Sequence, residues 1–156
     1  EKVIINSATI SNLDLITKAS DLIGSQSVTV SIDVKKTLFG IKKVFTHNGS
    51  KNSGRSPIEH AQLVEKAGAG EIIINSIDHE GTGAGYDLDL IREISSAVSI
   101  PVVALGGAAG VVDFKKAIQA GAHAVAAGSA FVYHGPRRAV LINYPTKNEL
   151  QSITPL

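Results

Sequence analysis

Short apolar runs and longer amphipathic stretches alternate along the chain. The apolar runs are rich in β-branched residues, which is typical of strands buried on both faces. Strands are therefore predicted at residues 2–6, 28–33, 71–77, 102–105 and 124–127. The stretches between them repeat apolar residues at helical spacing, which predicts helices over residues 13–23, 57–67, 88–98 and 113–120. This alternation with short links predicts parallel βαβ units with right-handed crossovers.

Local signals mark the ends of these helices. Asn12 is a candidate N-cap for the first helix, which Gly24 ends. The pair Ser56-Pro57 combines a capping hydroxyl with proline at the first helical position. Asp113 is expected to begin the fourth helix.

Two segments depart from the alternation. Residues 35–48 are too long and too polar for a tight link, and two short apolar runs flank their charged residues, so a β-hairpin inserted after the second strand is expected. Residues 135–156 hold three prolines and are expected to form irregular structure with one or two helical turns.

Five parallel strands and four helices leave a sheet with open edges, which is an aggregation liability. The sheet is therefore either doubly wound or part of a (β/α)8 barrel. Gly106-Gly107 follows the penultimate strand and Gly128-Ser129 follows the last one. A phosphate site in the loops after strands seven and eight is a recurring barrel feature, so the barrel is favoured. We expect one domain, residues 1–156, that forms part of a (β/α)8 TIM barrel.

Composition narrows the function classes. The net charge of +1 gives no electrostatic reason to expect nucleic acid or a membrane as partner, and the absence of cysteine excludes thiol chemistry and cysteine metal sites. No apolar run approaches the ~20 residues that span a bilayer, and a cytoplasmic protein is expected. The sequence has no methionine and begins directly with a strand, so we expect a piece of a longer chain. A complete domain released from a tag is the alternative.

Glycine-rich loops follow three successive strands. They are Gly81-Thr82, Gly106-Gly107 and Gly128-Ser129. Glycine lets backbone N–H groups approach an anion, and a following helix adds a favourable dipole. A phosphate site is therefore expected, the alternative being that the glycines only make tight turns and close packing.

Two aspartates end strands in matching tripeptides. Asp33 ends Ser31-Ile32-Asp33, and Asp78 ends Ser76-Ile77-Asp78. A carboxylate at the carboxyl end of a barrel strand is well placed for general acid–base chemistry. Catalysis is the favoured role for Asp33, whereas a structural or supporting role is equally open for Asp78.

The histidines show no metal-ligand spacing, and neither a metal nor a cofactor is expected. His60 and His123 fall in helical contexts and are expected to be structural. His47 and His79 remain candidates for contact with a substrate.

Taken together, these features resemble the cyclase subunit of imidazole glycerol phosphate synthase, the (β/α)8 barrel of histidine biosynthesis. The resemblance extends to Phe131, and it places the chain in the second half of a ribulose-phosphate-binding barrel, strands four to eight. The matching segments are Lys2–Ser7, Ser31–Asp33, Asn52–Gly54, Gly68–Glu71, Ser76–Thr82, Gly85–Asp87, Gly106–Ala108 and Gly128–Phe131.

The resemblance implies an ammonia-dependent cyclase that acts with a glutaminase on an aminoimidazole-carboxamide ribonucleotide bearing two phosphates. Asp33 matches one of two catalytic aspartates, with Asp78 and Asn75 as possible supporting residues. The other aspartate lies on a strand outside this chain. At the opposite face, Lys2 and Glu71 match half of a charged ring that gates ammonia. The resemblance implies that one phosphate is held by Glu80, Gly81, Gly107, Gly128 and Ser129. The other is held partly by Asn6 and Ser7 and partly by residues outside this chain.

Some residues depart from the family pattern. Glu80, Asn75 and Ala109 replace the usual aspartate, threonine and glycine. Residues 131–145 resemble instead the tail of a paralogous branch associated with the amidation of surface-polysaccharide sugars, which becomes the favoured branch.

Two other classes remain open. One is a non-catalytic phosphate-binding barrel that docks a glutaminase. The other is a different phosphate-binding barrel such as an aldolase, which is disfavoured because Lys35 and Lys36 lie past the strand end. The chain alone is expected to self-associate through its open edges, as a dimer.

Overall fold

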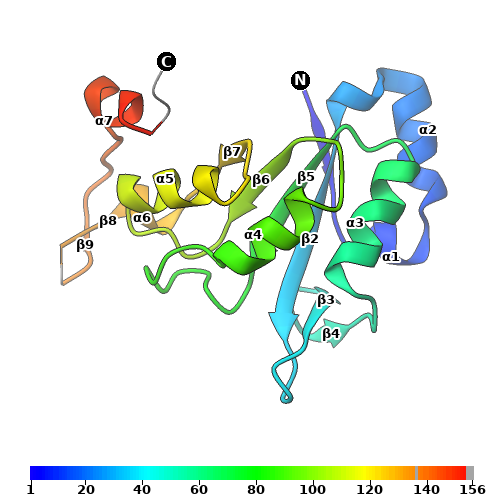
Figure 1. Cartoon of the computed structure of the whole chain (residues 1–156), viewed down its shortest axis with the longest axis horizontal. Coiled ribbons are helices and arrows are strands. Elements are labelled where there is room, and N and C mark those ends of the chain that lie inside the picture. The colour runs from blue at the N-terminus through cyan, green and yellow to red at the C-terminus, as the bar shows by residue number, and fades with distance from the viewer. Residues whose placement is uncertain (136, 154–156) are drawn as a thin grey trace.

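A computed structural model describes residues 1–135 and 137–153 and shows a parallel sheet flanked by helices (Figure 1). Residues 136 and 154–156 of the predicted domain lie outside the described residues. The parallel strands pair in chain order, each with the next. They are β1 (Val3–Ile5), β2 (Val28–Lys36), β5 (Glu71–Ser76), β6 (Val102–Leu105) and β7 (Ala124–Val125).

This strand order is that of a partial (β/α)8 barrel. A doubly wound sheet reverses its strand order at one point, whereas here every parallel neighbour in the sheet is also the next parallel strand along the chain. Helices link successive strands, as right-handed crossovers require. They are α2 (Asp14–Ile23), which is followed by the 3-10 turn η1 (Ser25–Ser27), then α3 (Pro57–Lys66), α4 (Leu88–Ser95) and α5 (Val111–Gln119).

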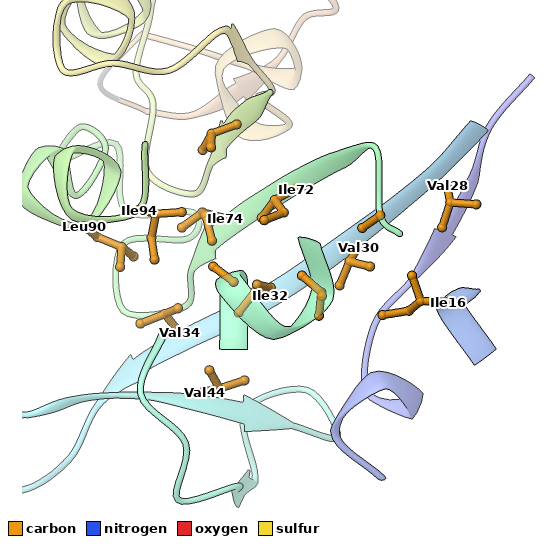
Figure 2. Packing of buried hydrophobic residues seen from close by; sticks show 14 residues of the cluster. Ile16, Val28, Val30, Ile32, Val34, Val44, Ile72, Ile74, Leu90 and Ile94 are labelled. Atoms are coloured by element: carbon orange, nitrogen blue, oxygen red, sulfur yellow. The ribbon is translucent and has the colours of Figure 1, made fainter. Parts of the chain in front are cut away.

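Alternate residues of β2 show which face the helices cover. Val30, Ile32 and Val34 are at most 2% exposed and belong to one apolar cluster with Ile16 of α2 and Val64 of α3 (Figure 2). Because successive side chains of a strand point to opposite faces, the residues between them lie on the other face. That face is polar and half-buried where it carries Ser31 and Asp33.

The predicted hairpin insertion is confirmed. β2 continues past the parallel sheet and pairs antiparallel with β3 (Lys42–Thr46), which pairs in turn with β4 (Lys51–Asn52). The turn between β2 and β3 is closed by hydrogen bonds between Thr37 and Ile41 and from Gly40 to Thr37. It carries Leu38 and Phe39 out into solvent.

Several predicted helix ends need correction. Asn12 does not cap α2; it ends a separate short helix, α1 (Ala8–Ser11), because its own N–H bonds back to Ala8. Ser56 caps α3 as predicted, with Pro57 at the first position. Helix α4 ends at Ser95, earlier than expected. Asp113 lies in the first turn of α5, which begins at Val111.

The irregular structure with one or two helical turns expected over residues 135–156 is confirmed for the described residues up to 153, apart from a two-residue strand. After α6 (Ser129–Val132), β8 (Tyr133–His134) pairs with β9 (Ala139–Val140) in a hairpin, and the short helix α7 (Lys147–Gln151) follows. Phe131 connects the tail to the body through its ring, which lies 6.0 Å from Phe114 and 5.3 Å from Tyr144, centroid to centroid. The hairpin and α7 therefore lie at the β7 end of the sheet, far from α2 (Figure 1). No helix among the described residues is both long and apolar enough to cross a membrane.

Candidate functional site

Asp33 is held between two amides on the polar face of the sheet. Asn6, just after β1, donates from Nδ2 to Asp33 Oδ2 at 3.2 Å. Asn75 of β5 donates from Nδ2 to Asp33 Oδ1 at 3.0 Å. The register of β2 and β5 places Asn75 directly opposite Asp33. Each carboxylate oxygen thus has one fixed donor, so the carboxylate is oriented while part of it remains open to a ligand.

A buried chain of hydrogen bonds holds the backbone of Asn6 in position. Thr9 Oγ1 donates to the Asn6 carbonyl at 2.8 Å and lies 3.1 Å from Nε2 of His60. Thr9 donates its only hydroxyl proton to the Asn6 carbonyl, so its oxygen can only accept from His60. The neutral imidazole of His60 therefore carries its proton on Nε2. His60 Nδ1 then accepts from Arg55 Nη1 at 3.3 Å. Burial, together with the nearby Arg55 charge, lowers the pKa of His60 to about 4. His60 is therefore structural, as predicted from its helical context.

Asn75 is packed closely against the next strand end. A Cβ on Gly106 would lie 3.0 Å from Asn75 Oδ1 and 2.6 Å from the carbonyl oxygen of Ser76. Only glycine fits there. The Oδ1 atom of Asn75 is buried and has no hydrogen-bond partner within the described part of the chain.

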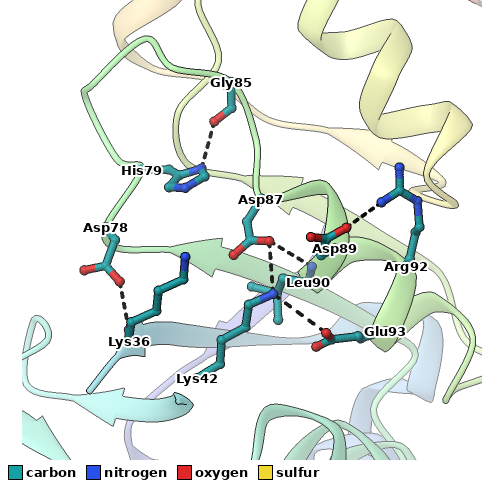
Figure 3. A network of polar contacts seen from close by, with 10 residues as sticks. All are labelled: Lys36, Lys42, Asp78, His79, Gly85, Asp87, Asp89, Leu90, Arg92 and Glu93. Atoms are coloured by element: carbon teal, nitrogen blue, oxygen red, sulfur yellow. Dashed lines mark hydrogen bonds and ion pairs between the residues drawn. The ribbon is translucent and has the colours of Figure 1, made fainter. Parts of the chain in front are cut away.

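Asp78 is engaged elsewhere. Its Oδ2 accepts from the backbone N–H of Lys36 at 2.8 Å (Figure 3). No hydrogen bond of the described residues joins Asp78 to Asp33. This contact ties the loop after β5 to the inserted hairpin. His79 stabilises the same loop from within, because its Nδ1 lies 3.0 Å from the Gly85 carbonyl oxygen.

A second link joins the inserted hairpin to the start of α4. Lys42 Nζ lies 3.1 Å from Asp87 Oδ1 and 3.9 Å from Glu93 Oε1 (Figure 3). Burial opposes ionisation of Asp87, but the Leu90 N–H and the Lys42 ammonium outweigh it and lower the pKa of Asp87. The loops of the carboxyl face are therefore fixed to one another by several polar contacts.

A pocket of about 220 Å³ opens between three of these loops and the tail hairpin. Gly81 and Ser129, both predicted phosphate ligands, line it and lie close to each other. A Cβ on Gly81 would lie 4.0 Å from Ser129 Oγ. The other lining residues are Thr82, Gly83, Ala108, Ala109, Ala130, Tyr133, Gly135 and Arg138.

The pocket wall is rich in hydrogen-bond donors. The hydrogen bonds formed within residues 1–135 and 137–153 use neither the backbone N–H of Gly81, Gly83 or Ala108 nor the hydroxyl of Ser129. The hydroxyl of Thr82, by contrast, donates to the His79 carbonyl and shapes the loop. Unused N–H groups in residues that line one hollow are suited to an anion.

The remaining predicted phosphate ligands near this pocket do not line it. Glu80 donates its N–H to the carbonyls of Ser76 and Ile77. Gly107 accepts from the Gly85 N–H, and a Cβ on it would collide with the Gly85 carbonyl oxygen. Gly128 precedes α6. For Gly107 the structure therefore supports a packing role.

Asn6 and Ser7, which the resemblance assigns to the second phosphate, lie beside Asp33 and away from this pocket. Ser7 Oγ is 3.5 Å from Asn6 Oδ1 and accepts from the backbone N–H of His47 at 3.3 Å. The sequence pointed to a phosphate role for Asn6 and did not indicate its contact with Asp33.

Lys2 and Glu71 meet at the opposite, amino end of the strands. Lys2 Nζ lies 2.8 Å from Glu71 Oε2, and Thr29 Oγ1 donates to Glu71 Oε1 at 3.0 Å. The two residues predicted to gate ammonia are thus an ion pair on the polar side of the sheet.

Among the residues of the pocket that sequence reasoning missed are Tyr133 and Arg138, which bring an aromatic ring and a positive charge. The available signal was the Arg137-Arg138 doublet in the tail, but nothing in its neighbourhood indicated where the tail would fold. No group of three His, Cys, Asp or Glu side chains within the described residues is arranged to hold a metal ion.

Comparison with known proteins gives consistent matches. The histidine biosynthesis protein family matches residues 1–136. The chain is 48% identical over 151 residues, 96% of its length, to a protein of Pseudomonas aeruginosa provisionally named imidazole glycerol phosphate synthase subunit hisF2. It is 43% identical over 98% of its length to a provisionally named subunit HisF of Leptospira interrogans.

A third relative matches a shorter part of this chain. The imidazole glycerol phosphate synthase subunit HisF of Petrotoga mobilis is 45% identical over 134 residues, 85% of this chain and 53% of the relative. The chain covers 60% and 61% of the first two relatives. It therefore spans between about half and three fifths of the length of these proteins.

Proposed function

The chain belongs to the histidine biosynthesis protein family, and on that premise we propose that its protein is an ammonia-dependent cyclase of the imidazole glycerol phosphate synthase type. The proposed substrate is an aminoimidazole-carboxamide ribonucleotide bearing two phosphates, and a glutaminase subunit supplies the ammonia. The observation that carries this proposal is Asp33, fixed by Asn6 and Asn75 on the polar face of the sheet.

In this mechanism Asp33 moves protons while the imidazole ring closes. General acid–base catalysis needs a carboxylate within hydrogen-bond reach of the reacting group. The two amides hold Asp33 in one orientation, which reduces the reorganisation needed in the transition state. A phosphate bound between Gly81 and Ser129 would anchor one end of the substrate, at a strand-end pocket of the kind that barrels use for phosphate. Lys2 and Glu71 would line the entry for ammonia at the amino end of the strands.

The test is Asp33→Asn in the protein at its natural length, with ammonium salt as nitrogen source. We expect cyclisation to be abolished while the thermal midpoint stays close to wild type. The oxygen of the new amide still accepts from one of the two neighbouring amides, and its NH2 group can donate to the other once that side chain turns its oxygen towards it. Wild-type turnover in this variant would exclude Asp33 as the catalytic group. Stimulation of a glutaminase without any cyclisation, in the wild type, would favour the docking barrel instead.

A second candidate is the paralogous role in amidation of surface-polysaccharide sugars. One observation favours it: the relatives provisionally named hisF2 and HisF match 96% and 98% of the chain, tail included, whereas the Petrotoga mobilis cyclase subunit matches 85%. Deletion of the gene in its host separates the two candidates. Histidine auxotrophy supports the biosynthetic role, and loss of amidated surface sugar with growth unaffected supports the paralogous one.

A further inference from the structure

We infer that Arg138, on the tail hairpin β8–β9, is the cationic ligand of a phosphate group bound in the pocket between Gly81 and Ser129. The inference rests on the proposed function for the presence of that phosphate, and it adds to it the residue that supplies positive charge. Residues 1–136 match the family pattern, so Arg138 lies just beyond the part that the family pattern covers.

Arg138 is held at the pocket by two contacts. Its Nη1 donates to the Gly81 carbonyl at 3.1 Å, across 57 positions of sequence. Its guanidinium carbon lies 4.6 Å from the centroid of the Tyr133 ring, within the range of a cation–π interaction. One hydrogen bond and one stacking contact fix the plane of the guanidinium but use only one of its five N–H donors.

The remaining donors suit a phosphate. Guanidinium forks match phosphate oxygens with two parallel hydrogen bonds, which are stronger than those between neutral groups. Gly81, Gly83, Ala108 and Ser129 add neutral donors from the other walls of the pocket. Without Arg138, no cationic side chain lines this pocket within the described part of the chain.

Local charge supports the same role. Within residues 1–135 and 137–153, no carboxylate lies within ion-pair distance of Arg138.

The backbone of Arg138 has a φ of +49°, in the left-handed region, in the turn that joins β8 to β9. Such a conformation is unusual for arginine, and it is the one that returns the chain to pair Tyr133 with Val140.

The experiment is a titration with inorganic phosphate of the isotope-labelled protein at its natural length. The readout is the backbone amide resonances of Gly81 and Ser129, because a second phosphate site elsewhere would not move them. We expect saturable shifts in the wild type. In Arg138→Ala the dissociation constant should rise by about tenfold or more, since one charge-assisted contact is lost. Arg138→Lys should bind with intermediate affinity, because it keeps the charge without the fork.

The matched control is Arg137→Ala, which removes the same charge from the same turn and should leave the affinity unchanged. Shifts at Gly81 and Ser129 with equal affinity in the wild type and Arg138→Ala would overturn the role of Arg138 and leave the phosphate site standing. No shift in the wild type would overturn both. If Arg138→Ala does not fold, Arg138→Lys and Tyr133→Leu test the same point, and wild-type affinity in both would contradict the inference.

Discussion

Asn75 stands directly opposite Asp33 across the parallel strands β2 and β5, and its side-chain amide donates to one oxygen of the carboxylate at 3.0 Å. The contact depends on strand register, because a shift of one residue would turn either side chain to the helix-covered face. The same amide carries a buried oxygen with no partner in the described part of the chain. The side-chain nitrogen of Asn75 thus stabilises the position of Asp33, whereas its buried, unpaired oxygen costs free energy of folding.

Replacement of Asn75 by alanine should affect activity more than stability. We expect kcat of the protein at its natural length to fall by about tenfold with KM within twofold, because Asp33 loses one of the donors that orient it. The free energy of unfolding should fall by about 1 kcal/mol or less, since loss of the hydrogen bond is offset by removal of the unpaired oxygen. Steady-state kinetics and denaturant unfolding measure the two effects. Asn12→Ala, at an exposed position, is the control, and an unchanged kcat in Asn75→Ala would contradict the orienting role.

Protonation of His60 should destabilise the fold at mildly acidic pH. Its pKa in the folded protein is about 4, below the ordinary value of 6.5. Between these values the unfolded chain binds the proton more readily, so the free energy of unfolding falls as the pH falls from 6.5 towards 4. The loss is about 1.4 kcal/mol for each pH unit.

Unfolding by urea at a series of pH values measures this slope. His60→Gln should be less stable at neutral pH and should lose this part of the pH dependence, whereas His123→Gln, at an exposed histidine, should keep it. An identical slope in wild type and His60→Gln would rule out His60 as the source.

Glycine at position 107 should be needed for the full stability of the fold. Its φ is +104°, and a Cβ would lie 2.8 Å from His79 Cβ as well as colliding with the Gly85 carbonyl oxygen. We expect Gly107→Ala to cost about 3 kcal/mol or more, from left-handed strain together with backbone displacement. Gly110→Ala is the matched control in the same loop, because its φ of 173° is extended and nothing lies within 4 Å. Equal thermal midpoints for the two variants would show that the contact at Gly107 is relieved without cost.

The strands of this fold could be predicted because their signal is local. Runs such as Ile72–Ile74 are β-branched and bounded by polar residues, and they form strands wherever helices cover them. Asp33 could be predicted as a site residue for the same reason, since its position at a strand end places it at the carboxyl face. The inserted hairpin was also encoded locally, by two apolar runs on either side of a polar turn.

The parts that could not be predicted depend on distant contacts. The hairpin β8–β9 has only two residues in each strand and is held by Arg138 against Gly81, 57 positions away. Asn12 has a side chain suited to capping, but its backbone N–H bonds to the Ala8 carbonyl and so ends the preceding helix α1. The contact of Asn6 with Asp33 could not be predicted because Asp33 follows 27 positions later, across the β1–β2 pair.

The chain order of the parallel strands bears on how such a site diverges among relatives. Gly81, Ala108 and Ser129 each come from a different segment that follows a strand of the sheet. One wall of the pocket can therefore be exchanged without changing the register of any strand. The terminal hairpin is such a wall, because it brings Tyr133 and Arg138 to a hollow whose other sides are formed by segments that follow the strands of the sheet. Ligand preference can thus evolve by replacement of a terminal segment, while Asp33 and its two amides stay in place.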